Sequence, residues 1–493
     1  MWTRLNLGCL VLVLACFRLC HIRLLWADED YHLAAAIHIL NGKVPYRDFW
    51  YDKPPLCAVF YLFIGGYAGW PLRILDAAYI LLACYLAYLL ARDWWGELEG
   101  WTAALLLAFF TTFYLPSAVI PLAADGLMIV PHLAAIYCAR RKLPVWAGMW
   151  SGIALLFNIK ALFVLAACAL LLAARRQKRS PERSDGSFHT SALLLFGFAL
   201  PLAITLIAAL LSGAWAGYCE QVWRWGFIYA EGSPVLHPLK TGLTRTGNWI
   251  GFHAALFVGA VYGLVRASRN DRTQLLAWMS LSFAAVCLGT RFAPHYFLQL
   301  LPPLVIAASG GIVLGLQAYP KRVAALITAL LLVPFVRFGP RYALLVIDNL
   351  SHRDPNWSDV VMDLDSQHAA AEIRSLAHPG DTLFVWGYRP DLYVYTRMSP
   401  NSLFWDSQPL TGVPADRHLS ATNAIYSGPA TANRQQLARS RPTFIVDGLS
   451  RFNPKLSPDV FPVLRPWMAS YTLADETKLS LIYRRTELSK RNK

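Results

Sequence analysis

Long apolar runs, bounded by charged residues or by Pro and Gly, fill the first two-thirds of the chain. Each run approaches the length of about 20 residues that an α-helix needs to cross the hydrocarbon core of a bilayer. The pattern predicts a polytopic, mainly α-helical membrane domain with about eleven spans, of which the fifth and sixth are short. The predicted spans are residues 5–25, 74–91, 101–115, 122–138, 144–158, 161–174, 191–212, 249–265, 273–290, 296–317 and 323–337.

Two arginines, Arg18 and Arg23, lie near the end of the first predicted span. A charged side chain at mid-membrane costs about 2.5–3.5 kcal/mol. We therefore expect both arginines to lie near the membrane surface or to face other helices.

After residue 337 the pattern changes from apolar runs to a polar segment of helices and short strands. Residues 369–376 read as a helix, and residues 382–386, 443–446 and 479–483 read as strands. This alternation predicts a small soluble α/β or α+β domain over residues 338–493, following a membrane domain over residues 1–337. Its aromatic residues are expected to form the core and rim of that domain; they are Trp386, Tyr388, Tyr393 and Tyr395.

Composition supports a membrane protein. Hydrophobic residues make up 56% of the 493 residues and charged residues only 15%, whereas a soluble domain usually has about 25% charged and under half apolar residues. The chain also has 18 Trp, an amphipathic residue that gathers at membrane surfaces. This balance excludes a water-soluble enzyme, a disordered chain and a fibrous repeat.

The net charge of +15 is distributed in a way that argues against nucleic-acid binding. Basic residues cluster in short loops between apolar runs, as is typical of the cytoplasmic side of a membrane. The clusters lie at residues 140–142, 175–183, 266–272 and 321–322. We therefore expect a multi-pass protein of the inner (plasma) membrane with a cytoplasmic N-terminus, and only loop charge on the cytoplasmic side. The segments expected outside are residues 26–73, 116–121, 213–248 and those after 337, with a short outer turn at 158–160.

The first outer segment carries the most informative polar residues. Asp28-Glu29-Asp30 follows the first span directly, where adjacent acids are costly unless they are paired, metal-bound or functional. An alternative is a solvated N-terminus of a surface helix that runs to Leu40, because acids there complement the helix dipole. Both interpretations can hold together.

A second motif in this segment is Tyr51-Asp52-Lys53-Pro54-Pro55-Leu56. The two prolines forbid a helix through Lys53 and hold it in an extended turn at the depth of the lipid headgroups. The simpler interpretation is a lysine that reaches toward the membrane surface.

Further polar residues fall at predicted outer edges of spans. They are Asp125, Lys160, Arg291 and His295, the last followed by Tyr296. Three of them have a simpler explanation: Asp125 could cap a helix or pair with a lysine, Lys160 could mark a loop, and His295 could be a surface histidine. Together they indicate a site on the outer face that handles an anionic, lipid-linked substrate.

Aromatic residues crowd the outer segment 213–248, and this leaves two interpretations open. They are Trp215, Tyr218, Trp223, Trp225 and Tyr229. Such side chains anchor proteins at the membrane interface, and they also stack on sugar rings.

The order of these motifs resembles the C-type membrane glycosyltransferases. The branch that looks closest is family 39 and its bacterial relatives, the protein O-mannosyltransferases and lipid A aminoarabinose transferases. The resemblance covers roughly residues 1–337, and the ordered set is more specific than any single motif. That set is Asp28-Glu29, Gly42-Lys43-Val44-Pro45-Tyr46, Lys53-Pro54-Pro55-Leu56, Asp125, Lys160, Arg291, His295-Tyr296 and Leu301-Pro302-Pro303-Leu304.

The resemblance implies inverting transfer of a sugar from a polyprenyl-phosphate donor to an acceptor on the outer face. Asp28 would be the general base, poised by the nearby like charge of Glu29. Lys53, Lys160 and Arg291 would bind the donor phosphate. The supporting residues would be Asp52, Asp125, His295 and Tyr296.

The sequence predicts no metal site. His32 and His38 lie on different faces of a helix, and no ligand spacing demands an ion, although Glu29 or Asp52 could hold a divalent cation. The sugar and the acceptor, whether lipid, protein or glycan, stay open. The alternative functions are a lipid or glycolipid transporter (flippase) and a non-catalytic assembly protein of the cell envelope.

Overall fold

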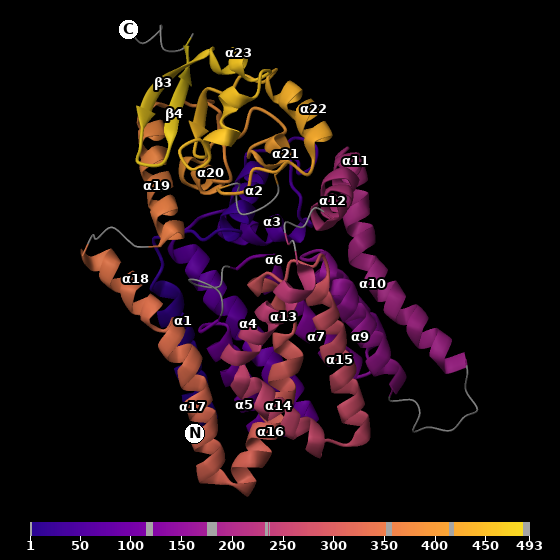
Figure 1. The fold of residues 1–493 in the computed structure, drawn as a ribbon. Coiled ribbons are helices and arrows are strands. Elements are labelled where there is room, and N and C mark those ends of the chain that lie inside the picture. The colour runs from indigo at the N-terminus through magenta and orange to yellow at the C-terminus, as the bar shows by residue number, and fades with distance from the viewer. Residues whose placement is uncertain are drawn as a thin grey trace. The chain divides into compact units, whose positions relative to one another are not determined.

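The computed structural model describes residues 2–114, 122–174, 185–231, 235, 237–351, 357–413 and 419–486. Within these ranges the chain is mainly helical and contains one four-stranded sheet (Figure 1). It forms two compact units, each assembled from separate segments of sequence. Unit 1 comprises Met1–Ile22, Trp70–Ile207 and Val235–His352, and unit 2 comprises Arg23–Gly69, Ala208–Pro234 and Arg353–Lys493.

The described residues of unit 1 form helices and the turns between them. Its elements are α1 (Trp2–Leu19), α4 (Trp70–Trp94), α5 (Glu97–Phe110), α6 (Ala124–Leu127), α7 (Ile129–Arg140), α8 (Pro144–Leu155), η2 (Ile159–Ala161), α9 (Leu162–Ala174), α10 (Asp185–Leu211, whose end belongs to unit 2), α13 (Pro238–Phe252), α14 (Ala254–Arg266), α15 (Arg269–Cys287), η4 (Pro294–Gln299), α16 (Leu301–Ala318), α17 (Pro320–Phe338) and α18 (Pro340–Ser351).

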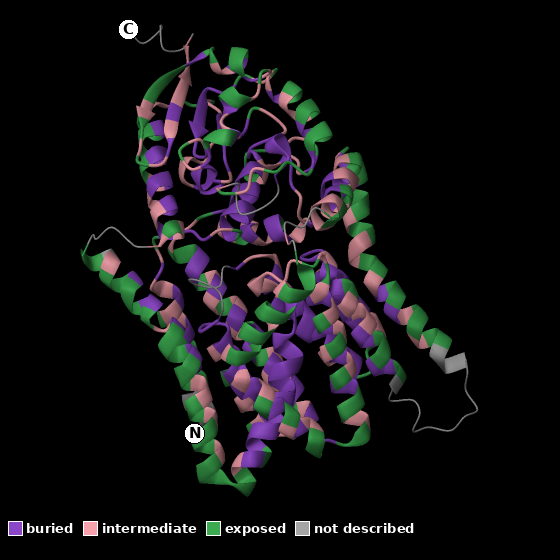
Figure 2. Cartoon of the chain, in the orientation of Figure 1, coloured by how far each residue is buried: buried purple, intermediate pink, exposed green. Residues whose placement is uncertain are grey.

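Helix α16 is the most buried long helix of unit 1 (Figure 2). It crosses α14 at very short range because glycines face each other there. A Cβ atom on Gly311 would lie 1.9 Å from the carbonyl oxygen of Gly259 and 2.5 Å from the nitrogen of Gly263. Small residues spaced in this way allow helix backbones to pack closely inside a membrane, where the hydrophobic effect does not drive association.

Other apolar helices of unit 1 expose most of their surface. Only 17% of the apolar window in Phe188–Leu211 and 11% of that in Pro320–Asp348 are buried. Exposed apolar surface of this extent requires a nonaqueous partner. It is the property expected of helices that face lipid, and it agrees with the composition.

Four helices in the described residues are long and apolar enough to cross a membrane. They are Trp70–Trp94, Phe188–Leu211, Leu301–Ala318 and Pro320–Asp348. A fifth candidate is the pair α13 and α14, which bends by 85°. The predicted span over residues 249–265 overlaps this pair and coincides mainly with α14, and the helix breaks at His253 near the start of that range. The total of eleven spans stays a prediction.

Of the two arginines of the first predicted span, Arg18 lies as expected. Arg18 is buried, pairs with Asp76 of α4 at 3.3 Å and donates to the carbonyl oxygen of Thr111 at 2.9 Å. Arg23 is exposed. Arg18 thus faces neighbouring helices, which avoids the cost of an unpaired charge in an apolar environment.

The expectation of only loop charge on the predicted cytoplasmic side is wrong for Arg140. This side chain is buried at the end of α7 and pairs with Asp93 at 3.2 Å and with Asp271 at 3.5 Å. Its guanidinium also lies 3.9 Å from the ring centroid of Trp94. The acids come from α4 and α15, far away in sequence, so Arg140 joins three helices.

Unit 2 combines short helices with the sheet. Its elements are α2 (Glu29–Leu40), α3 (Leu56–Phe60), η1 (Tyr61–Ile64), α11 (Trp215–Tyr218), the π-helical turn η3 (Cys219–Arg224), α12 (Trp225–Glu231), α19 (Ser358–Leu376), β1 (Leu383–Trp386), α20 (Asp391–Thr396), α21 (Gln408–Thr411), α22 (Ser427–Leu437), β2 (Phe444–Asp447), η6 (Pro454–Leu456), η7 (Pro458–Val460), α23 (Arg465–Met468), β3 (Tyr471–Glu476) and β4 (Leu481–Arg485).

The sheet has the strand order β1-β2-β4-β3. Strands β1 and β2 are parallel, with Leu383 opposite Phe444, and the other two pairs are antiparallel. The three predicted strands match β1, β2 and β4 to within two residues. Strand β3 was not predicted, because this edge strand is mostly exposed and polar and lacks a regular apolar alternation.

The first outer segment is an integral part of unit 2. The buried ring of His38 on α2 lies 4.9 Å from the rings of both Tyr393 and Trp405. The backbone N–H of Trp50 donates to the carbonyl oxygen of Leu403 at 2.6 Å. Residues predicted as a loop of the membrane domain therefore pack with the C-terminal residues.

The predicted outer segment 213–248 also contributes to the core of unit 2. Trp225 is buried, with its ring 5.6 Å from that of Trp50 and 4.7 Å from that of Tyr426. Anchoring at a membrane interface is therefore the wrong interpretation for Trp225. The predicted boundary at residue 337 also differs from the observed division, since α17 and α18 carry helix on to Ser351.

Candidate functional site

Asp28 occupies a strained turn immediately before α2. Its backbone has φ 76° and ψ −40°, close to a γ-turn geometry that non-glycine residues rarely adopt. The buried carboxylate of Glu29 folds back and accepts the backbone N–H of Trp26 at 2.9 Å. This hydrogen bond closes the turn, and Asp28 itself is exposed. Backbone strain of about 1–3 kcal/mol is typical of residues whose position serves a function.

The predicted helix after Asp28 is present, but it is not a surface helix. Helix α2 runs to Leu40 and is buried from Glu29 to His38. The interpretation of Asp28, Glu29 and Asp30 as one solvated helix start is therefore wrong for the second and third acids. Only Asp28 presents its carboxylate to solvent.

Lys53 forms an ion pair with its neighbour Asp52 at 3.0 Å. The lysine side chain is 37% exposed and the aspartate side chain 9%. Tyr46 donates its hydroxyl to the carbonyl oxygen of Lys53 at 2.8 Å, and the Lys53 ammonium lies 5.9 Å from the ring centroid of Tyr229. Burial is the largest single influence and lowers the pKa of Lys53, but Asp52, Tyr229 and Asp28 together outweigh it, so the net pKa is raised. The ammonium therefore stays charged and accessible.

Asp28 and Lys53 lie close enough to influence each other electrostatically, with His32 beside them. The ring of His32 is buried and its Nδ1 lies 2.7 Å from the hydroxyl of Tyr51. Burial, together with the charge of Lys53, lowers the pKa of His32 to about 4, so this histidine is neutral near pH 7. The site thus offers an exposed carboxylate that can accept a proton and an exposed ammonium that can bind an anion.

The structure adds two residues to this cluster: Tyr388, which the sequence assigned to the core or rim of the C-terminal domain, and Asp406, which it did not single out. The carboxylates of Asp28, Asp52 and Asp406 all act on the phenol of Tyr388. Burial, reinforced by Asp52, raises the pKa of Asp406 to about 7. An acid directly after the apolar pair Phe404-Trp405 was the signal available in the sequence.

A second polar cluster lies within unit 1 and centres on Asp125. Its Oδ1 atom accepts hydrogen bonds from the side-chain amides of Asn158 at 2.9 Å and Gln299 at 3.2 Å. Its Oδ2 atom lies 3.8 Å from Nε2 of His295. The buried Lys160 places its ammonium 2.8 Å from the ring centroid of Tyr296.

Four predicted site residues, Asp125, Lys160, His295 and Tyr296, therefore meet in unit 1. Arg291 begins the turn that leads to η4, and its carbonyl oxygen accepts a hydrogen bond from Arg245 at 2.7 Å. The residues on both sides of Arg291 have positive φ values.

Asn158 and Gln299 were missed as partners of Asp125. Asn158 was only the start of a predicted outer turn, and Gln299 is a lone amide in an otherwise apolar stretch. Both are buried, and a buried amide is expected to find a hydrogen-bond partner. A polar residue in an apolar run was thus a usable but weak signal.

The divalent cation that the sequence left open finds no obvious site. In the described part of the chain, no group of three or more His, Cys, Asp and Glu side chains is arranged to hold a metal ion.

Comparison with known proteins supports the predicted resemblance at the level of the fold. No protein-family model matches the sequence, and no curated protein matches it. The structure, however, has the fold of the C-type membrane glycosyltransferases over nearly its whole length.

Two solved structures of ArnT from Cupriavidus metallidurans are similar to this chain. The one bound to undecaprenyl phosphate has a TM-score of 0.62 at 15% identity, and the match covers 98% of this chain and 97% of that chain. The apo structure has a TM-score of 0.58 with the same identity and coverage. The oligosaccharyltransferase of Archaeoglobus fulgidus in its apo form has a TM-score of 0.51 at 13% identity, covering 92% of this chain and 70% of that chain. At these identities the likeness establishes a shared fold.

Proposed function

We propose that the protein is an integral membrane glycosyltransferase that moves a sugar from a polyprenyl-phosphate donor to an acceptor on the outer face of the membrane. The observation that carries the proposal is the exposed carboxylate of Asp28, held on a strained turn near the ion-paired ammonium of Lys53. The fold supports it, because a structure of similar fold was solved with undecaprenyl phosphate bound.

The chemistry is a single displacement. Asp28 takes the proton of an acceptor hydroxyl, and the acceptor oxygen forms a bond to the anomeric carbon of the donor. As that bond forms, the bond from the anomeric carbon to the phosphate oxygen breaks, and its electron pair leaves with the phosphate. Attack opposite the leaving group inverts the anomeric centre. Lys53 binds the departing phosphate as a positive point charge, and the phosphate needs no dedicated acid.

The residues of unit 1 enter the proposal through the family resemblance. Lys160 and Arg291 are proposed to bind the donor phosphate, and His295 and Tyr296 to support the site. Asp125 accepts two amide hydrogen bonds, which fix the orientation of its carboxylate. A residue held in this way is typical of a positioned functional group.

The proposed location is the inner (plasma) membrane, with the N-terminus in the cytoplasm and the C-terminal residues outside. The exposed apolar helices of unit 1 support a membrane location. A reporter enzyme that folds only outside the cytoplasm, fused after residue 493, should be active. An inactive reporter on an inserted chain would contradict the orientation.

The direct test is donor consumption in proteoliposomes supplied with short-chain polyprenyl-phosphate sugars. Asp28→Asn should lower consumption by a factor of about 100 or more, because a general base contributes about 10²–10⁴. The matched control is Glu372→Gln, which neutralises an exposed carboxylate on α19, and it should leave the rate unchanged.

Two outcomes would favour the alternatives. If the folded native chain consumes no donor but moves labelled lipid across the bilayer, the protein is a transporter or flippase. If it does neither and Asp28→Asn has no phenotype, a non-catalytic assembly role becomes the better explanation.

A further inference from the structure

Tyr388 lies on the loop between β1 and α20, close to the candidate base. It is only partly buried, whereas the neighbouring aromatic residues Trp386 and Tyr393 are fully buried core residues, as predicted. Tyr388 lines a small, partly open hollow together with Ala27 and Asp30, the residues on either side of Asp28 and Glu29. Its placement therefore differs from that of a core aromatic.

The ring of Tyr388 is held by stacking inside unit 2. It stacks on Tyr31 with ring centroids 5.6 Å apart and an angle of 19° between planes. Tyr31 stacks in turn on Tyr51 at 5.4 Å and on Trp405 at 4.7 Å. Because Tyr31 and Tyr51 belong to the two motifs that carry Asp28 and Lys53, this stack couples Tyr388 to the proposed site.

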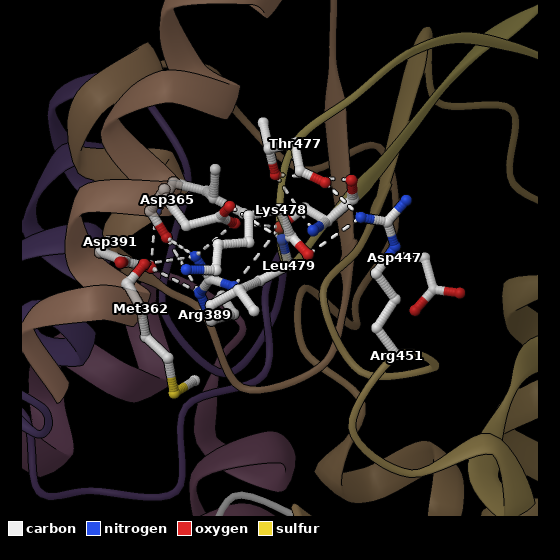
Figure 3. A network of polar contacts seen from close by, with 12 residues as sticks. Met362, Asp365, Arg389, Asp391, Asp447, Arg451, Thr477, Lys478 and Leu479 are labelled. Atoms are coloured by element: carbon white, nitrogen blue, oxygen red, sulfur yellow. Dashed lines mark hydrogen bonds and ion pairs between the residues drawn. The ribbon is translucent and has the colours of Figure 1, made fainter. Parts of the chain in front are cut away.

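The backbone of the same loop is fixed from the other side by Arg389. This fully buried guanidinium donates to Ser366 at 2.9 Å and pairs with Asp365 at 3.4 Å and Asp391 at 3.9 Å (Figure 3). It also donates to the carbonyl oxygen of Met362. A loop fixed by a stacked ring and a buried ion-pair network holds the Tyr388 hydroxyl in one place, as a binding site requires.

The electrostatic surroundings of the phenol are acidic. Four carboxylates act on it, those of Asp28, Asp30, Asp52 and Asp406. Burial, reinforced by these carboxylates, raises the pKa of Tyr388 well above its ordinary value, so the hydroxyl stays neutral and remains a proton donor.

The charges around the phenol determine whether it can contact the donor phosphate or the acceptor. A phosphate beside this hydroxyl would be repelled by the carboxylates around it. The accessible cation proposed for the donor phosphate in this unit is Lys53. A neutral or cationic group with hydroxyls is compatible with them. The group that must approach Asp28 in the proposed reaction is the acceptor.

We infer that Tyr388 is an acceptor-binding residue whose hydroxyl donates a hydrogen bond to an oxygen of a neutral or cationic, hydroxyl-bearing acceptor beside Asp28. The inference rests on the proposed function. It adds that a residue of the C-terminal segment binds the acceptor. The hydrogen bond positions the acceptor, and Asp28 remains the group that takes its proton.

The test separates hydrolysis of the donor from transfer to the acceptor. Full-length protein in proteoliposomes first receives a short-chain polyprenyl-phosphate sugar alone. It then receives the same donor with increasing amounts of cell-envelope membranes as the acceptor probe, taken from a strain that lacks this protein. Tyr388→Phe keeps the stacked ring and removes only the hydroxyl. Its apparent KM for acceptor should rise about 3- to 10-fold, the effect of one hydrogen bond, with donor KM and donor hydrolysis unchanged.

The matched control is Tyr483→Phe, a partly exposed tyrosine on β4, which should behave like the native chain. Tyr388→Leu provides a second variant without the ring, and thermal unfolding identifies any variant that does not fold. Native kinetics in a folded Tyr388→Phe would overturn the inference and leave the proposed function standing. An equal loss of hydrolysis and transfer would overturn the acceptor role. A native chain that consumes no donor would refute the proposed function, and the inference with it.

Discussion

Replacing Arg389 by methionine should destabilise unit 2 strongly. The substitution keeps most of the side-chain volume but removes the positive charge. It would leave Asp365 and Asp391, both about 5% exposed, as buried carboxylates without their cation. Removing one partner of a buried ion pair costs about 3–5 kcal/mol, because the remaining charge is not solvated.

A matched control lies nearby in the same unit. Arg451 pairs with Glu476 at 2.6 Å, but these side chains are 32% and 59% exposed. An exposed pair contributes about 0–1 kcal/mol, so Arg451→Met should have a small effect. The two arginines therefore test burial with the same chemical change.

The assay is thermal unfolding of purified protein in detergent, followed by tryptophan fluorescence. For a domain of 150–250 residues, about 1 kcal/mol shifts Tm by about 2–4 °C. We expect Arg389→Met to lower Tm by about 6–20 °C and Arg451→Met by less than about 4 °C. Adding Asp365→Asn and Asp391→Asn to Arg389→Met should recover part of the loss. Equal shifts for the two single variants would refute the reasoning from burial.

Three further predictions follow from the described contacts. Gln299→Leu removes one of two amide donors to Asp125 and should lower donor turnover about tenfold; an unchanged rate would remove Asp125 from the site. Gly311→Ala places a methyl group against Gly259 and should cost about 1–3 kcal/mol in thermal unfolding, whereas Gly251→Ala, with open space around it, should cost nothing. Burial raises the pKa of Asp406 to about 7, so the folded state binds its proton more tightly than the unfolded chain does. Stability should therefore fall as pH rises from about 4 to 7, by at most about 1.4 kcal/mol per pH unit from this group. Asp406→Asn should flatten that slope, and an unchanged slope would contradict the shift.

The order of motifs along the chain was sufficient to predict the fold resemblance. Apolar runs, a polar C-terminal segment and the spacing from Asp28 to Tyr296 are local or ordinal properties that a sequence displays directly. Strands β1 and β2 were predictable for the same reason, since both are short, fully buried apolar runs.

Features that depend on distant partners were not predictable. In the sequence Arg140 looks like loop charge, and only the folded structure shows its ion pairs with Asp93 and Asp271 of other helices. Tyr388 looks like any aromatic of a small domain until its loop is seen beside the turn that carries Asp28. The partners of Arg140 and of Tyr388 cannot be inferred from the residues next to them in the sequence.

The bend at His253 was missed for a different reason. Hydropathy is averaged over a window of residues. The helices on both sides of the break, α13 and α14, together are apolar enough to form a span. The ring of His253 stacks on Trp249 with centroids 4.1 Å apart, and its Nδ1 lies 2.8 Å from the carbonyl oxygen of the same residue. The bend thus coincides with a local polar contact of His253, which hydropathy averaged over a window does not detect.

The composition of unit 2 from three separated segments has a consequence for biosynthesis. Helix α2 is buried against residues such as Tyr393 and Trp405, which the ribosome produces more than 300 residues later. At about 5–20 residues per second, synthesis of the intervening chain takes roughly 18–73 s. During that interval the apolar residues of α2 have been made and the residues that cover them have not. The nascent protein must therefore be shielded, by a chaperone or by the membrane surface, until translation is nearly complete.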